Sequence, residues 1–179
     1  MSADPAAALS YRDHLPLAWH ALPEGETTPT YEHENLSTLF AVSALEEHRD
    51  LPAEDGPLHE EIHRLHQKMD LLVNMMCSLI RTQTPHPPAV ALQLSAQRLS
   101  WQPQDGPRPD VGMRVLLEIY LHNGMTQPLR LPARVISASD AEAVAEFEPL
   151  AENSLAALER HVFLHHRRSI AGARQAAQR

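Results

Sequence analysis

The stretch AVALQLSAQRLSW, residues 89–101, alternates apolar and polar side chains, which is the period of a β-strand with one buried face. The same alternation returns in three later segments, residues 113–122, 129–137 and 143–148. Asn123-Gly124 stands between the first two of these segments, and this dipeptide tolerates the positive φ angles of a tight hairpin turn. The second half of the chain is therefore predicted to be mainly β-sheet.

An earlier apolar segment, Leu15 to Leu22, is predicted to be a short strand, and its prolines favour an edge position. A helix is expected to follow over residues 35–50, with Asn35 as its N-cap. This helix is apolar on more than one face, which suggests burial on two sides. A C-terminal helix within residues 153–179, from about Asn153 to Ala173, is expected to close the chain.

The longest helix is predicted over residues 57–84, because Pro57 suits a first helical position and Pro85 stops helix formation. Its apolar residues are separated by alternating steps of four and three, which is typical of a coiled-coil seam. Seven positions follow this rule: Leu58, Ile62, Leu65, Met69, Leu72, Met76 and Leu79.

Toward the C-terminal end of this helix, Val73, Met75 and Ile80 widen the apolar stripe beyond what two helices can cover. We therefore expect self-association, with a parallel homotetramer favoured and a trimer as the alternative. The helix over residues 35–50 is expected to pack outside the bundle. A single amphipathic helix lying on its own domain is the other interpretation of the same pattern.

Two histidines, His59 and His66, fall at e positions beside the seam. Protonation of such histidines near pH 6 would place positive charges next to one another across a parallel bundle. We expect the assembly to weaken between roughly pH 7 and pH 5, which sedimentation velocity would measure. A sedimentation coefficient that stays constant over this range would contradict the expectation.

The chain has 179 residues, of which 43% are hydrophobic and 21% charged, as in soluble globular proteins. Because no stretch approaches the roughly 18 apolar residues of a spanning helix, we expect a cytoplasmic protein with no membrane insertion. Residues 1–61 carry 13 acidic and 2 basic side chains, a net charge of −11. This acidity argues against nucleic-acid binding, which needs a basic surface.

Candidate chemistry is sparse. The single cysteine, Cys77, excludes an internal disulfide and is expected to be an ordinary thiol. Among 12 histidines, the pairs His59/His63 and His161/His165 are four apart and could chelate an ion, but no third ligand is visible. We expect no metal and no other cofactor, although a metal-dependent enzyme stays open as an alternative. The cluster from His165 to Arg168 could hold a phosphate or simply suit the end of a helix dipole.

No Gly-x-Ser-x-Gly motif, dinucleotide-binding glycine motif or phosphate-binding loop is present, and the chain has only 6 glycines. We therefore expect that the protein is not an enzyme.

Taken as a unit, the β-rich part resembles a PilZ domain, a bacterial β-barrel module associated with the second messenger cyclic di-GMP. The resemblance covers roughly residues 88–165 and lies in the order of the parts: the strand and turn of residues 90–101, then residues 111–115, 133–136 and 144–147. It implies an α+β fold, a six-stranded antiparallel β-barrel interrupted by two long helices and followed by a C-terminal helix. Residues 1–34 and 86–152 would form a split barrel, and residues 35–84 an inserted oligomerisation element.

The resemblance also implies a ligand site, formed in that family by an Arg-x-x-x-Arg loop and an Asp/Asn-x-Ser-x-x-Gly turn. Here Ser95 matches the turn, but Gln93 replaces the Asp or Asn and Arg98 replaces the Gly. Arg81 is the sole arginine near the expected loop. Cyclic di-GMP binding is therefore expected to be weak or absent.

The implied function is a non-enzymatic, oligomeric signalling adaptor in cyclic di-GMP-linked regulation of motility or virulence, which acts on a protein partner. The alternative is a genuine cyclic di-GMP receptor with unusual contacts, from Arg81, Ser95, Arg98 and the C-terminal basic cluster.

Overall fold

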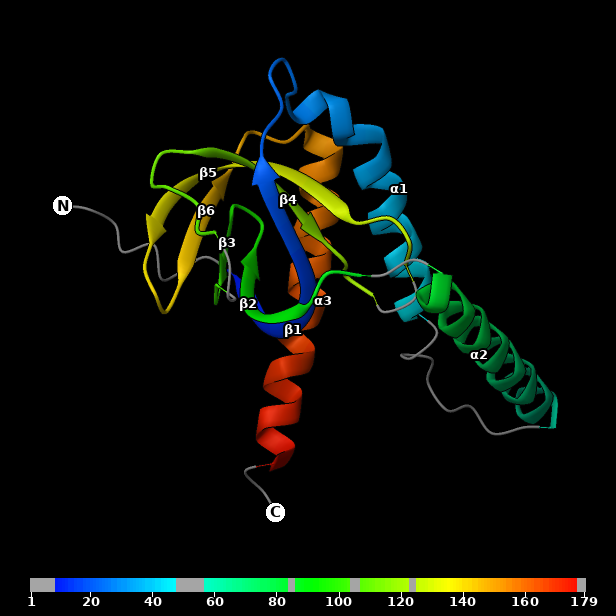
Figure 1. Ribbon diagram of the computed structural model, residues 1–179. Coiled ribbons are helices and arrows are strands. Elements are labelled where there is room, and N and C mark those ends of the chain that lie inside the picture. The colour runs from blue at the N-terminus through cyan, green and yellow to red at the C-terminus, as the bar shows by residue number, and fades with distance from the viewer. Residues whose placement is uncertain (1–8, 48–56, 84–85, 104–106, 123–124, 177–179) are drawn as a thin grey trace.

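The computed structural model describes residues 9–47, 57–83, 86–103, 107–122 and 125–176, of which residues 47, 57–59, 80–83 and 172–176 are described by their backbone alone. These ranges contain six strands and three helices (Figure 1). The strands are β1 (Ser10–Ala21), β2 (Ala89–Ser95), β3 (Arg98–Trp101), β4 (Arg114–Ile119), β5 (Leu129–Ala138) and β6 (Ala143–Phe147). The helices are α1 (Thr28–Glu47), α2 (Pro57–Gln83) and α3 (Glu152–Ala176).

The strands form a closed barrel in the order β1-β2-β3-β6-β5-β4, with every pair antiparallel. Side chains that alternate along each strand point inward and fill the barrel, because a strand's neighbouring residues face opposite sides of the sheet. Leu94, Leu99, Leu117 and Leu129 are fully buried there. The predicted α+β barrel is confirmed.

β1 is not an edge strand, which corrects the expectation drawn from its prolines. Its first part, Ser10 to Pro16, pairs with β2, and its second part, Leu17 to Ala21, pairs with β4. Pro16 lies where the strand changes partner, so its missing N–H falls at the junction of the two ladders.

The stretch over residues 89–101 is two strands, because Ser95 ends β2 and Arg98 begins β3 on the other side of a turn. The expected hairpin dipeptide Asn123-Gly124 lies outside the described residues.

Two helices cover the barrel and one leaves it. α3 packs on β1 and β2, where Leu158 and Val162 are buried in the common core, and α1 packs on α3 and β5. α2 extends away from the barrel, and no described strand or helix packs against it (Figure 1).

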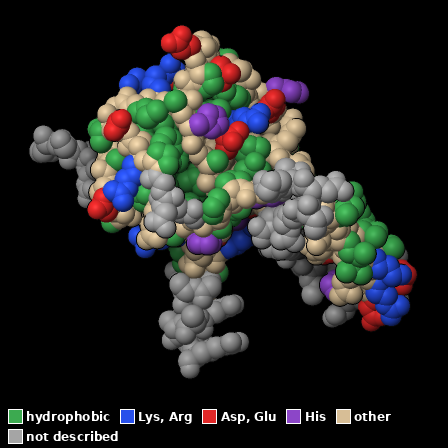
Figure 2. Space-filling view, in the orientation of Figure 1, with side chains coloured by type: hydrophobic (Ala, Val, Ile, Leu, Met, Phe, Trp, Pro, Cys, Tyr) green, Lys and Arg blue, Asp and Glu red, His purple; other side chains and the backbone are tan. Residues whose placement is uncertain are grey.

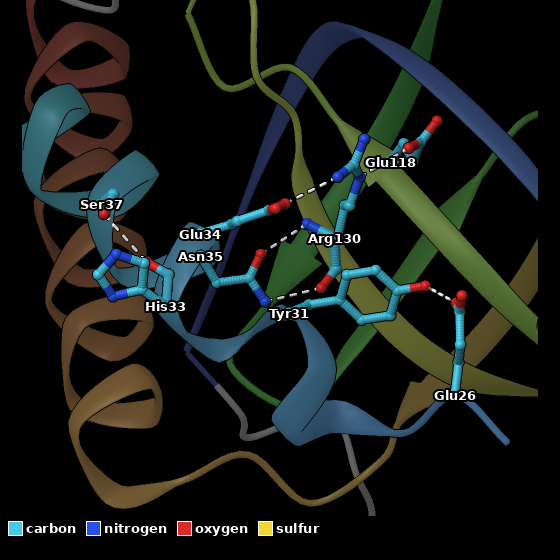
Figure 3. Close-up of polar contacts among 8 residues, drawn as sticks. All are labelled: Glu26, Tyr31, His33, Glu34, Asn35, Ser37, Glu118 and Arg130. Carbon is cyan, nitrogen blue, oxygen red and sulfur yellow. Dashed lines mark hydrogen bonds and ion pairs between the residues drawn. The ribbon is translucent and has the colours of Figure 1, made fainter.

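α1 begins seven residues before the expected start. Thr27 precedes its first turn, and the Thr27 N–H donates to Thr30 Oγ1 at 3.3 Å, one half of a capping box. Asn35 therefore caps nothing; it is buried within the helix and faces β5. Its Nδ2 donates to the Arg130 carbonyl at 2.7 Å, and its Oδ1 accepts from the Arg130 N–H at 2.8 Å (Figure 3).

The Arg130 side chain adds ion pairs with Glu34 of α1 (2.7 Å) and Glu118 of β4 (2.9 Å), so one residue ties the helix to the barrel (Figure 3). The expectation that this helix is buried on two sides is not met within the chain. Leu39 and Val42 are buried, whereas Phe40 is 66% exposed.

Candidate functional site

The most prominent surface of the chain is the apolar seam of α2. Its described members are each between 40% and 63% exposed: Ile62, Leu65, Met69, Leu72, Met76 and Leu79. Of the other predicted seam residues, Leu58 and Ile80 lie within the helix, but their side chains are outside the described set. A 27-residue helix is about 40 Å long at 1.5 Å per residue, so the seam is a continuous apolar strip of that order, far beyond what monomers usually expose.

The structure adds Leu71 to the exposed apolar stripe and leaves the predicted Val73 less exposed than the other residues. Leu71 and Met75, at the c and g positions, are 60% and 61% exposed, while Val73 at an e position is half-buried. Cys77, at the adjoining b position, is a free cysteine and is buried. Among the b positions, Cys77 is buried whereas His63 and Asp70 are exposed, and the exposed apolar residues of α2 lie at c, g, d and a positions.

Figure 2 shows these hydrophobic side chains along α2, with charged side chains at the end that points away from the barrel. That end is the N-terminal one, and it carries Glu60, Glu61 and Arg64. The C-terminal end of α2 lies next to the barrel (Figure 1).

The turn between β2 and β3 holds the residues that were predicted to be ligand-site remnants. Ser95 is buried, and its hydroxyl is fully used by the turn. Ser95 Oγ accepts from the N–H groups of Arg98 (3.0 Å) and Gln97 (3.3 Å), and it donates to the Arg98 carbonyl at 3.1 Å. Ser95 thus stabilises the turn and has little capacity left for a ligand.

Gln93 lies beside a surface groove of about 470 Å³ over β1, β2 and β3. Its side chain binds within the protein: Nε2 donates to Ser10 Oγ at 2.8 Å, and Oε1 accepts from Arg12 Nε at 3.1 Å. Arg12 is the basic residue of the groove, but Asp13 and Glu142 line it too. Two carboxylates beside one guanidinium disfavour an anionic ligand.

The remaining predicted positions do not join a common site. Arg98 is the cross-strand partner of Glu146, so a carboxylate stands opposite it on β6. Arg81 lies in the last turn of α2 and not in a loop; its side chain is outside the described set. Ser95 and Arg98 meet at one turn and Gln93 lies two residues before it on β2, where the second described arginine, Arg12, is held by the Gln93 side chain.

A family model described as an atypical PilZ domain, cyclic di-GMP receptor, matches residues 36–175. The chain belongs to the atypical PilZ domain family. No curated protein matches it. Among solved structures, it is similar to a tetrameric PilZ domain of a pathogenic protein from Xanthomonas campestris, which self-assembles through an unusual helical bundle. The TM-score is 0.67 at 25% identity, over 93% of this chain and 92% of that one.

A second match, the inhibitor of motility from Bacillus subtilis, has a TM-score of 0.36 at 20% identity and covers 46% of this chain and 42% of that one. No described helix of this PilZ chain is long and apolar enough to cross a membrane.

The basic cluster of this PilZ chain is not at the end of a helix, because α3 continues to Ala176. The helix-dipole interpretation is therefore wrong, because that effect is confined to the last turn of a helix. His165 Nε2 and Arg168 Nη1 bind the two carboxylate oxygens of Glu46, at 2.8 Å and 2.9 Å. His166 Nδ1 lies 2.6 Å from the Ser10 carbonyl, and Arg167 lies over the Phe163 ring.

Glu46 is the functional candidate that sequence analysis missed. It sits on α1, and His161 and His165 of α3 face it, with one ligand atom of each of the three within 4.8 Å of the others. Burial raises the pKa of Glu46, but the hydrogen bond and charge of His165 outweigh it and lower this pKa to about 2. Burial lowers the pKa of His161 to about 4. The sequence held one indication that Glu46 is buried. Glu46 lies at helical spacing from Leu39 and Val42, so all three residues share one helix face.

Proposed function

We propose that this PilZ protein is a non-enzymatic signalling adaptor whose α2 helices hold four copies together as a parallel homotetramer. The exposed apolar seam on α2 carries the proposal, because a strip of six or more large apolar residues is stable in water only when another surface covers it. The tetrameric PilZ domain of Xanthomonas campestris, which aligns over nearly the whole chain, supports the same assembly.

The width of the stripe favours four helices over two. Two-stranded coiled coils bury mainly a and d positions, whereas this stripe extends over Leu71 and Met75. At roughly 1.5–3 kcal/mol for each buried Leu or Met side chain, covering Leu71 and Met75 as well favours the larger bundle. A trimer remains the alternative. In a parallel bundle the four barrels would all lie at the C-terminal end of the helices.

The same proposal divides the chain into an inserted oligomerisation element, residues 35–84, and a split barrel formed by residues 1–34 and 86–152. The pairing of β1 with β2 and β4 supports this division, because the helices interrupt one barrel. The adaptor would act in the cytoplasm without a cofactor, and would pass on cyclic di-GMP-linked control of motility or virulence through a protein partner.

The polar groups at the β2–β3 turn support the proposal of weak or absent cyclic di-GMP binding. The Ser95 hydroxyl is already hydrogen-bonded within its own turn. The groove beside Gln93 is lined by one arginine and two carboxylates, a balance that disfavours an anionic ligand. Titration calorimetry with cyclic di-GMP is expected to show no binding at a ligand concentration of about 100 µM, a range in which a micromolar site would be saturated.

A micromolar dissociation constant would support the alternative, a genuine receptor with unusual contacts. In that case Arg98→Ala tests whether the ligand binds at the β2–β3 turn. If Arg98 contacts a phosphate of the ligand, the substitution should lower the affinity for cyclic di-GMP at least about tenfold. Arg108→Ala is a matched control: Arg108 forms an exposed ion pair with Asp140, away from the β2–β3 turn.

A further inference from the structure

We propose that Glu46, His161 and His165 form a zinc site that ties the end of α1 to α3. The three side chains come from two helices and gather at one place, and one ligand atom of each lies within 4.8 Å of the others. Glu46 and His161 are buried and His165 is half-buried, so the site lies inside the helix pair and not on an open surface.

The set of ligands matches the preference of zinc. Two imidazoles and a carboxylate are a common three-residue set for Zn²⁺. His161 and His165 are four apart on α3, so they lie on the same helix face, one turn apart. Glu46 supplies the negative charge from the opposite helix.

The distances require only side-chain adjustment. Zinc–nitrogen and zinc–oxygen bonds of about 2.0–2.2 Å place tetrahedral ligand atoms about 3.3 Å apart. His165 Nε2 and Glu46 Oε1 are already 2.8 Å apart. The third ligand atom, from His161, must approach by about 1.5 Å at most to reach this spacing, a displacement that small χ rotations of the three side chains provide.

Partners outside the ligand set hold the three residues in place. Arg168 Nη1 donates to Glu46 Oε2 at 2.9 Å, which leaves Oε1 turned toward His165. Tyr11 stacks on the His165 ring at a centroid distance of 4.6 Å, and its hydroxyl lies 2.9 Å from His161 Nε2. Such contacts orient ligands and are worth 10- to 100-fold in metal affinity. Zinc would replace the Glu46–His165 hydrogen bond.

The fourth ligand is a water molecule in the neighbouring cavity. This cavity, of about 510 Å³, lies between α1 and α3, and both Glu46 and His161 line it. The rest of its wall is largely apolar, from residues such as Leu36, Leu39 and Leu164. The apolar part of the wall lowers the local dielectric and so strengthens the interaction of the ion with its ligands.

Zinc titration of the chelator-stripped full chain tests the proposal. We expect one ion per chain with a micromolar or tighter dissociation constant, and a higher melting temperature with zinc than without. Glu46→Gln, His161→Gln and His165→Gln should each weaken binding at least tenfold, since even partners outside the ligand set are worth that much. His63→Gln is the matched control: His63 belongs to the other histidine pair, on exposed α2, and bonds to Gln67.

Cobalt substitution of the wild type keeps the test decisive if a variant fails to fold. Co²⁺ should give the visible absorption of a tetrahedral nitrogen and oxygen site, with no thiolate band from Cys77. No zinc binding by the wild type at about 100 µM would overturn the proposal, because even a weak specific site would be filled there. Zinc binding of unchanged affinity in all three variants would overturn it equally.

Discussion

Leu72→Asp is expected to reduce the native mass of the protein about fourfold, from roughly 80 kDa for four chains of 20.0 kDa to a monomer. Leu72 is 61% exposed in the single chain, so the substitution does not disturb the barrel. In a parallel tetramer, however, it places four carboxylates in one layer of the bundle core. Burying unpaired charges costs several kcal/mol each, and about 1.5–3 kcal/mol of apolar burial is lost per chain.

Multi-angle light scattering measures this change directly. Asn74→Asp is the matched control, since it adds the same charge at an exposed f position of the same helix and should leave the mass unchanged. Circular dichroism verifies that both variants keep their helix and strand content. A wild-type monomer would refute the tetramer, and a Leu72→Asp variant that keeps the wild-type mass would show that the seam is not the interface.

Asn35→Ala is expected to lower the free energy of unfolding by roughly 2–6 kcal/mol, because two polar groups lose their partner and each costs about 1–3 kcal/mol when buried. The Asn35 side chain binds both the N–H and the carbonyl of Arg130. β6 pairs with β5 only from Ala133 onward, so the sheet itself offers Arg130 no partner on that side. The amide of Asn35 takes the place of a neighbouring strand.

Urea unfolding followed by tryptophan fluorescence measures the loss, as a lower midpoint with an unchanged slope. Ser37→Ala is the control in the same helix, because Ser37 is exposed and, among the residues that the structure describes, its hydroxyl donates to the His33 carbonyl one turn back (Figure 3). Its effect should stay within about 0.5 kcal/mol. A loss of that small size for Asn35→Ala would mean that water replaces the amide at no cost.

Local patterns determined which parts of the fold could be predicted. The alternation in β4, β5 and β6 and the heptads of α2 depend on neighbours within a few residues, and their bounds were close to those predicted. Asn35 shows the limit. An asparagine before an apolar run has the chemistry of an N-cap, and its role as a strand substitute depends on a free stretch of β5 almost a hundred residues later.

The same limit applies to the ligand-site and metal-site candidates. The weak match of the β2–β3 turn to the ligand-binding motif could be seen in the sequence. That the Ser95 hydroxyl bonds within its own turn could be seen only in the structure. Glu46 and His161 are far apart in the chain, so no spacing rule could join them. The heptad phase also gave no sign of the burial of Cys77, because the b positions of a coiled coil normally face solvent.

The order of the strands has a consequence for folding. β1 is synthesised first, yet its partner β2 follows only after residues 22–88, so Ser10 must find Ser95 across this interval. Contacts of such sequence separation are slow to form, because the loop entropy is lost before the pairing energy is gained. On the ribosome, β1 would therefore remain without its partner strand while α1 and α2 have already been synthesised. The barrel would close late in folding.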